Sequence, residues 1–213
     1  MLKVKSFEFN SFSENTYCIY GDDGKCVIVD AGCFTTGEQK ELVEFISKNK
    51  LTPVLALNTH GHIDHVFGNA FVLDRFQIGL AGHSSDNFLL EEYKNHAMFF
   101  GIRLKDETPL PSKLLSEGDR LEVGSSRLSI LHVPGHSPGS LAYYSAENSF
   151  VVVGDVLFHN SIGRTDLPKG NHETLMSSIK DKLFTLPDNT VVYCGHGPST
   201  TIGEEKKKNP FFK

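Results

Sequence analysis

The sequence predicts a layered α/β protein built from two similar halves. Each half opens with several short strands and continues with a helix and a further strand. Side chains with metal-ligand chemistry follow the ends of several of these strands. Because strand ends in layered α/β folds converge on one rim, where such folds place their sites, the pattern also predicts one shared site.

The first half is expected to hold four strands and a helix. Apolar and alternating runs indicate the strands, which cover residues 4–9, 16–20, 26–30 and 53–57. A capping box over residues 36–39, followed by apolar residues at helical spacing, predicts a helix over 37–49. The apolar stripe of this helix must cover a sheet.

The middle of the chain is predicted to be mostly helical. A short helix over 66–74 and a strand over 77–81 precede a longer helix, capped by Ser84 or Ser85. Its apolar stripe consists of Leu89, Tyr93, Ala97 and Phe100. Such a stripe is typical of a core-facing helix. Alternatively, its aromatic end forms a wall or lid beside a metal pocket, with Tyr93 in contact with substrate.

The second half returns to the two-residue period of strands. The predicted strands cover residues 120–123, 127–133, 141–144, 150–153 and 190–194. A helix over 172–184, with Leu175, Ile179 and Leu183 aligned, precedes the last of them. The order of elements therefore repeats that of the first half.

The composition favours a globular protein without a nucleic-acid surface. The net charge is −5, and the one dense basic run, Lys206 to Lys208, directly follows Glu204 and Glu205. The N-terminal residues lack the apolar core of a signal peptide, and no apolar run approaches the roughly 18 residues of a membrane span. We therefore expect one cytoplasmic domain over residues 1–213, with no membrane or nucleic-acid partner.

The four cysteines have no CxxC spacing, and three of them lie in or beside apolar runs. This favours reduced, structural thiols. Cys18 and Cys26 flank a predicted turn, so a disulfide between them is the alternative.

The densest chemical signal follows the strand over 53–57. Three imidazoles and one carboxylate occupy six consecutive positions: His60, His62, Asp64 and His65. A lone histidine is usually a hydrogen-bonded core or surface residue. Four such groups packed together would repel one another when protonated and would be costly to bury when neutral, unless a cation organises them. The segment therefore predicts a metal site.

Three further ligand candidates stand alone at or after strand ends, each preceded by glycine: His136, Asp155 and His196. Seven groups exceed the four ligands of one tetrahedral zinc, which indicates two divalent metals that share a carboxylate. The alternative is one metal, with three of the groups supporting the ligands. We expect zinc, although iron and manganese accept the same side chains.

The order of these residues resembles the metallo-β-lactamase-fold superfamily over nearly the whole chain. The matching motif is His60-x-His62-x-Asp64-His65, followed by His136, Asp155 and His196. Within the superfamily, Gly163-Arg164-Thr165-Asp166 and the segment from Gly195 to Glu204 resemble the short, single-domain glyoxalase II-like hydrolases. The resemblance implies a four-layer αββα sandwich, with two mixed sheets flanked by helices.

The resemblance also implies a role for each candidate. His60, His62 and His136 would hold the first metal; Asp64, His65 and His196 would hold the second; and Asp155 would bridge them. Asp30 would not bind the metal itself but would orient a ligand histidine. Alternatively, Asp30 is only a carboxylate in a turn. Glyoxalase II proper has a C-terminal helical extension whose basic residues grip glutathione, and we expect none here, because the chain ends 10 residues after Gly203.

The implied activity is hydrolysis of a thioester, such as S-lactoylglutathione or a related small acyl-thiol. A hydroxide held by the metals would attack the carbonyl, with Asp64 aligning it or shuttling its proton. Two alternatives remain: a mononuclear-iron persulfide dioxygenase of the same fold and a metal-bound binding module. Arg164 either pairs with Asp166 or contacts an anionic group of the substrate.

Overall fold

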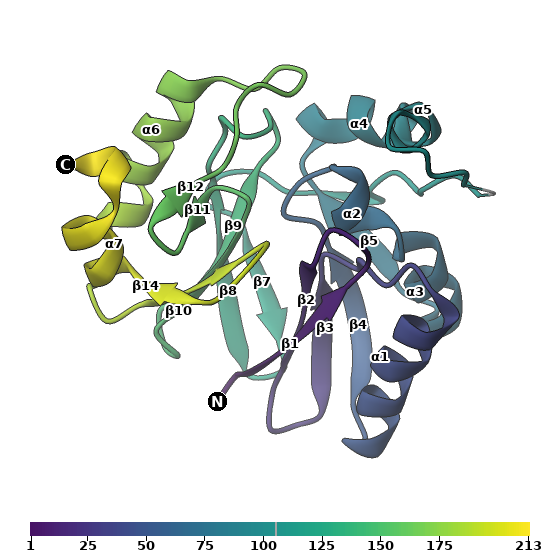
Figure 1. The fold of residues 1–213 in the computed structure, drawn as a ribbon. Helices are drawn as coiled ribbons and strands as arrows, with labels where there is room; N and C mark the ends of the chain where they lie inside the picture. Colours follow the sequence, from purple (N-terminus) through teal and green to yellow (C-terminus); the bar gives the residue numbers. More distant parts are fainter. Residues whose placement is uncertain (105) are drawn as a thin grey trace.

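Two six-stranded β-sheets face each other, with helices on their outer sides (Figure 1). The computed structural model describes residues 1–104 and 106–213. The first sheet has the order β1 (Lys3–Phe9), β2 (Glu14–Tyr20), β3 (Lys25–Val29), β4 (Thr52–Leu57), β5 (Gly79–Gly82) and β6 (Lys113–Leu114). Pairing is antiparallel from β1 to β3 and parallel from β3 to β6, so the sheet is mixed.

The second sheet is also mixed. Its order is β14 (Thr200–Thr201), β13 (Val191–Cys194), β10 (Phe150–Gly154), β9 (Leu141–Ser145), β8 (Ser126–His132) and β7 (Arg120–Val123). Only β10 and β13 pair in parallel, and a small hairpin of β11 (Leu157–Phe158) and β12 (Ser161–Ile162) lies beside the sheet. The predicted αββα sandwich of two mixed sheets is confirmed.

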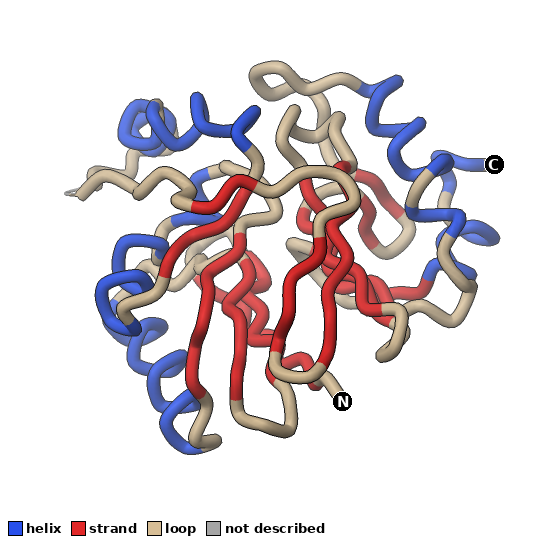
Figure 2. The backbone as a smooth tube through the Cα atoms, turned by 180° about the vertical axis from the view of Figure 1, so that it is seen from behind, coloured by secondary structure: helices blue, strands red, loops and turns tan. Residues whose placement is uncertain are grey.

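The helices complete the outer layers, as the view from behind also shows (Figure 2). Helices α1 (Thr36–Lys48) and α3 (Asn69–Phe76) pack Leu42, Ile46 and Val72 against the first sheet. Helices α6 (His172–Asp181) and α7 (Ile202–Lys208) pack Leu175, Ile179 and Ile202 against the second. The remaining helical pieces are α2 (Ile63–Val66), α4 (Asn87–Glu91), α5 (Tyr93–Phe99), and the 3-10 turns η1 (Ser84–Asp86), η2 (Leu183–Thr185) and η3 (Pro210–Phe212).

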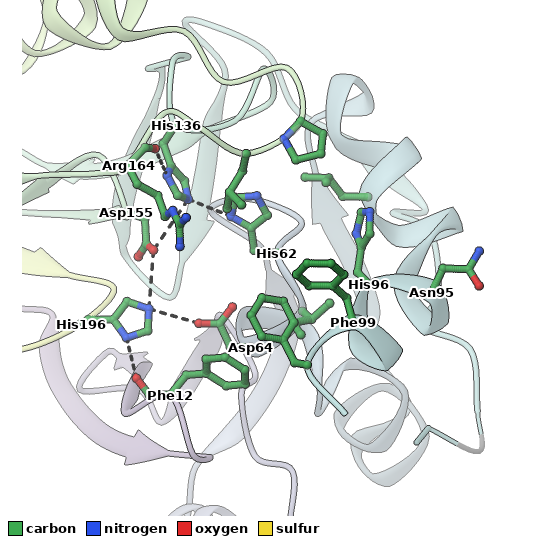
Figure 3. A pocket seen from close by; sticks show the side chains of 15 residues that line it. Phe12, His62, Asp64, Asn95, His96, Phe99, His136, Asp155, Arg164 and His196 are labelled. Atoms are coloured by element: carbon green, nitrogen blue, oxygen red, sulfur yellow. Dashed lines mark hydrogen bonds and ion pairs between the residues drawn. The ribbon is translucent and has the colours of Figure 1, made fainter. Parts of the chain in front are cut away.

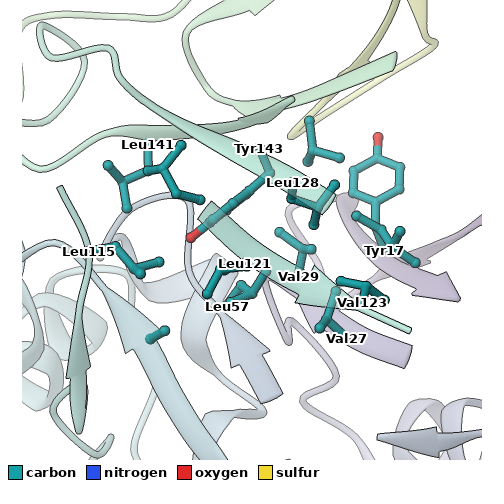
Figure 4. Close-up of a cluster of buried hydrophobic side chains, with 14 of the residues drawn as sticks. Tyr17, Val27, Val29, Leu57, Leu115, Leu121, Val123, Leu128, Leu141 and Tyr143 are labelled. Carbon is teal, nitrogen blue, oxygen red and sulfur yellow. The ribbon is translucent and has the colours of Figure 1, made fainter. Parts of the chain in front are cut away.

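The main core lies between the two sheets (Figure 4). Val27 and Val29 of β3 meet Leu128 of β8 and Tyr143 of β9 there. Residues 26–29 of β3 and the whole of β10 are buried without alternation, because both faces of these strands are covered.

A buried hydrogen bond links the two sheets beside the site. The hydroxyl of Tyr143 donates to the carbonyl of Asn58, directly after β4, at 2.6 Å. We expect Tyr143→Phe to lower the free energy of unfolding by about 1 kcal/mol, since it removes one buried hydrogen bond and no apolar contact. Urea denaturation would measure this loss. Tyr144→Phe, on the neighbouring, half-buried position, is the control, and an equal loss in both variants would contradict the assignment.

Two predicted helices are each broken into pieces. The helix expected over 66–74 begins as α3 only after Gly68, while Val66 ends the separate turn α2 in the predicted ligand loop. The amide of Gly68 donates to the carbonyl of Ala31 at 2.6 Å, and a Cβ there would lie 2.5 Å from Cys33 Sγ. The helix expected after Ser84 or Ser85 is η1, α4 and α5, with a break at Glu92 (φ −91°, ψ 10°). The apolar period survives a break of one residue, so the pattern could not detect it.

The predicted caps are also corrected. The capping box of α1 joins Thr35 and Glu38, one residue earlier than expected, and η1 is capped by the ring of His83 rather than by a serine. Helix α7 and the two-residue strands β6, β11, β12 and β14 were not predicted, because their periodic patterns are too short.

The four cysteines are free and buried, as predicted. Cys18 pairs with Ile28 and Cys26 with Tyr20 in the β2–β3 ladder, so the two thiols are offset by two positions. Within the described residues, no helix is both long and apolar enough to cross a lipid bilayer.

Candidate metal centre

The ligand candidates gather where the buried strands end. His60 and His62 lie in the loop after β4, and Asp64 and His65 belong to the single turn of α2. The other three candidates follow β8, β10 and β13: His136, Asp155 and His196. All seven predicted side chains are brought to this one edge of the sandwich, and Figure 3 shows five of them around a pocket.

A first group consists of three ring nitrogens that point at one another. Nε2 of His136 lies 3.3 Å from Nε2 of His60 and 2.8 Å from Nδ1 of His62. A neutral imidazole has one N–H, so three converging nitrogens cannot all be satisfied by hydrogen bonds among themselves. The point where their lone pairs meet would fit a shared cation.

A second group combines a carboxylate with two imidazoles. Oδ2 of Asp64 lies 3.1 Å from Nε2 of His196 and 3.6 Å from Nε2 of His65, and the two ring nitrogens are 3.3 Å apart. Two nitrogens that bind one tetrahedral zinc at about 2.0–2.1 Å are separated by about 3.3 Å. The spacing of the second group and the His60–His136 pair of the first therefore fit a metal ligand set, while the His62–His136 pair is closer, at 2.8 Å.

Asp155 lies between the two groups (Figure 3). Its Oδ2 is 3.7 Å from Nε2 of His136 and 3.5 Å from Nε2 of His196, and its Oδ1 is 3.3 Å from Nε2 of His65. Oδ1 is buried and accepts no hydrogen bond from the part of the chain that the structure describes. A buried carboxylate oxygen without a donor fits a cation in this position.

The surroundings shift the pKa values of three ligand histidines in opposite directions. Burial, together with the neighbouring histidines, lowers the pKa of His60 well below its usual value and that of His62 to about 3. Burial also opposes a charge on His65, but Asp64, Asp155 and Asp30 raise its pKa well above the usual value. A neutral imidazole presents the lone pair that a metal needs, so His60 and His62 are ready to bind.

In three of the ligand histidines, the ring nitrogen that points away from the site, Nδ1, faces an oxygen acceptor. Oδ2 of Asp30 lies 3.0 Å from Nδ1 of His65, while Thr59 donates to Asp30 through both its amide and its hydroxyl, at 2.7 and 2.6 Å. Nδ1 of His136 faces the carbonyl of Arg164 at 2.8 Å, and Nδ1 of His196 faces that of Phe12 at 3.0 Å. These acceptors leave Nε2 of each ring directed into the site.

Asp86 is a site residue that the sequence pattern did not reveal. Its buried carboxylate accepts from the amide of Gly61 at 3.0 Å, from the hydroxyl of Ser137 at 2.7 Å and from the amide of Gly139 at 2.6 Å. It therefore ties the loop of His60 and His62 to the loop of His136. Asp86 was hidden in a predicted helix start, where an aspartate is ordinary.

Glu14 was also missed. Its side chain is fully buried; Oε2 accepts from the hydroxyl of Thr16 at 2.9 Å, and Oε1 lies 3.8 Å from Nδ1 of His65. Burial raises the pKa of Glu14 well above its usual value. An isolated glutamate at the start of a strand gives no sequence signal for such a position.

The two candidate substrate contacts have different outcomes. Tyr93 is buried against Phe67 in a small apolar cluster, and among the described residues it does not line the pocket, so its predicted contact with substrate is corrected. The guanidinium of Arg164 pairs with both oxygens of Asp166 at 2.7 Å, which confirms the first alternative. Arg164 also lines the pocket, so its side chain still faces the site.

Comparison with known proteins agrees with this geometry. A family model described as the metallo-beta-lactamase superfamily matches residues 10–196. The chain is 37% identical over 212 residues to hydroxyacylglutathione hydrolase GloC of Haemophilus influenzae, covering 99% of this chain and 98% of that protein. It is 39% identical over 213 residues to probable metallo-hydrolase YqgX of Bacillus subtilis, covering 99% and 97%.

Solved structures with the same fold span nearly the whole chain. BLEG-1 B3 metallo-beta-lactamase has a TM-score of 0.87 at 36% identity, with 99% of this chain and 100% of that chain covered. TTHA1623 in a di-iron-bound form has a TM-score of 0.88 at 36% identity, with 98% of this chain and 100% of that chain covered. ETHE1 from Myxococcus xanthus has a TM-score of 0.79 at 27% identity, with 98% of this chain and 83% of that chain covered. The protein belongs to the metallo-beta-lactamase superfamily.

Proposed function

We propose that this protein is a hydrolase that binds two divalent metal ions and cleaves thioesters of small acyl-thiols. The observation that carries the proposal is Asp155, which lies between two groups of three ligand candidates and within 3.7 Å of a ring nitrogen in each. A single metal would leave one complete group without a function.

The two groups define the two sites. His60, His62 and His136 would hold one metal, Asp64, His65 and His196 the other, and Asp155 would contact both. Bound divalent metals lower the pKa of water from 15.7 to about 7 and polarise a carbonyl. We expect zinc, and the same donor atoms accept iron or manganese.

Asp64 is the residue that we assign to proton handling. Burial works to raise its pKa, but His65 and His196 hold the pKa below the usual value. Asp64 therefore stays a carboxylate at neutral pH and can orient a water molecule and accept its proton at an oxygen of the side chain. A thiolate is a good leaving group, so the reaction needs no strong acid on the other side.

The name of one relative supports thioesters, and the name of another adds a competing activity. GloC is a hydroxyacylglutathione hydrolase by name, which favours S-lactoylglutathione or a related acyl-thiol. BLEG-1 is named a B3 metallo-beta-lactamase, so a cephalosporin belongs among the test substrates. The alternative within the fold, a mononuclear-iron persulfide dioxygenase, uses one metal and consumes oxygen, whereas both groups of ligand candidates are complete here.

The decisive experiment combines metal analysis with substrate turnover. We expect the purified protein to bind close to two zinc ions per chain. With zinc at about 100 times its dissociation constant, each occupied site should add about 2.7 kcal/mol to the free energy of unfolding, or about 5 kcal/mol for both. The gain should appear as a rise in melting temperature that EDTA reverses. We also expect thiol release from S-lactoylglutathione without oxygen uptake.

Two results would contradict the proposal. One iron per chain, with oxygen consumed in the presence of glutathione persulfide, would assign the dioxygenase activity instead. Cleavage of the cephalosporin with no thioester turnover would keep the hydrolase and replace the substrate.

A further inference from the structure

The pocket over the metal centre has two unlike walls. It has a volume of about 550 Å³, and His62, Asp64, His136, Asp155 and His196 lie on one side of it. The other wall is apolar and comes from separate segments of the chain; its residues are Phe12, Leu89, Phe99, Phe100, Leu167 and Pro168. Figure 3 shows Phe99 on the side of α5, across the pocket from His136 and Asp155, with Phe12 near Asp64.

The aromatic rings form a connected but uncovered surface. Phe12 and Phe100 meet edge to face with ring centroids 5.5 Å apart, and Phe99 meets Phe100 in the same way at 5.7 Å. Phe99 is 88% exposed and Phe100 is 51% exposed. Two phenyl rings left open to water beside a polar site are unusual unless a ligand covers them, because their burial is strongly favourable.

The charges of the pocket argue against strong recognition of glutathione. A glutathione group carries two carboxylates and one ammonium, and its binding calls for cationic partners. Among the described residues, Arg164 is the one lysine or arginine that lines the pocket, and Asp166 already neutralises its charge by pairing with one edge of the guanidinium through both carboxylate oxygens. The other polar side chains opposite the metal centre are those of Asn95 and His96, at the apolar wall.

We propose that the preferred substrates are thioesters with a bulky apolar acyl group, aromatic or branched, that covers Phe12, Phe99 and Phe100. The thiol part need not be glutathione. This inference rests on the proposed thioester hydrolysis. The reaction adds one water across the carbonyl carbon–sulfur bond, which breaks to give a carboxylate, a thiol and one proton.

Four substrates distinguish the effect of the acyl group on turnover from the effect of the thiol group. Lactoyl and phenylacetyl thioesters, each made with glutathione and with N-acetylcysteamine, form a two-by-two set for the zinc-loaded protein. We expect kcat/KM to be about tenfold or more higher for phenylacetyl than for lactoyl with either thiol, as expected for partial burial of one ring. Exchanging glutathione for the uncharged thiol should change kcat/KM by less than about threefold.

The double variant Phe99→Ala/Phe100→Ala tests the wall itself. Because both rings are exposed, the fold should survive, and the acyl preference should fall to about twofold or less. Phe211→Ala is the matched control, since that ring is 46% exposed in η3 and is not part of the pocket lining within the described residues. Calorimetry with the uncleavable thioether S-phenethyl-N-acetylcysteamine should show binding to the wild type and the control, and about tenfold weaker binding to the double variant.

The outcomes separate this inference from the proposed function. Turnover of all four thioesters with a lactoyl preference, or an acyl preference that survives in the double variant, would overturn the inference and leave the hydrolase in place. No turnover of any thioester by the wild-type zinc protein would overturn the proposed function, and the inference with it.

Discussion

Asp155→Asn is expected to lower kcat for thioester hydrolysis by about 10³-fold, equivalent to about 4 kcal/mol. It should also reduce the bound metal from two ions per chain to one. The substitution keeps the shape of the side chain but removes the negative charge that lies within 3.7 Å of His65, His136 and His196. An amide oxygen binds a divalent cation far more weakly than a carboxylate. Elemental analysis and steady-state kinetics on the same preparation would measure both effects.

The charge on Asp155 is secured by its neighbours. Burial acts to raise the pKa of Asp155, but His65, His136 and His196 hold it below its usual range, so the carboxylate is ionised at neutral pH. The matched control is Asp188→Asn. Asp188 is exposed, lies away from the site, and forms an ion pair of 2.7 Å with Lys206. Full metal content and activity in Asp155→Asn would show that Asp155 does not join the two groups.

Asp86→Ala should cost both stability and metal affinity, although Asp86 is not among the seven ligand candidates. Its loss leaves the amides of Gly61 and Gly139 and the hydroxyl of Ser137 buried without their acceptor. We expect the free energy of unfolding to fall by about 3 kcal/mol, at about 1 kcal/mol or more for each abandoned donor. Metal affinity should fall about 10–100-fold, as it does when supporting contacts of ligands are removed.

A conservative variant separates positioning from bulk stability. Asp86→Asn keeps one acceptor oxygen and the size of the side chain, so metal affinity should recover in part. Asp74→Ala, an exposed aspartate in α3, controls for the loss of a carboxylate. Chemical denaturation and zinc titration against a competing chelator are the measurements. If Asp86→Ala lowers stability while metal affinity stays at the wild-type value, Asp86 does not position the ligand loops.

The chemistry of the site could be predicted from the sequence because the ligand types are concentrated and regularly placed. His60 to His65 form a dense cluster, and His136, Asp155 and His196 each follow a buried strand that has its own apolar signal. The seven side chains lie together in the structure as expected. The family motif added the αββα architecture, which no strand or helix pattern specifies by itself.

The sequence could not predict the role of a residue when that role depends on which distant residues it contacts. Asp86 and Glu14 are ordinary acids in the chain. Folding buries Asp86 against the ligand loops, whose amides it binds, and buries Glu14 within 3.8 Å of the His65 ring. Tyr93 and Phe99 lie on one short helix, and the break at Glu92 sets how this helix meets the pocket. The helical spacing already placed Tyr93 on the core-facing stripe, but only packing decided that Phe99 faces the pocket.

The sequence by itself therefore determined which side chains this protein has for metal chemistry and at which strand ends they stand. The tertiary structure decided which of their atoms meet, which acids hold them, and what surface a substrate encounters. The physical reason is the separation along the chain of the residues that interact. Periodicity and motifs record local preferences along the chain, whereas burial, charge pairing and the shape of a pocket depend on residues brought together from distant segments, such as Phe12, Asp86 and His196.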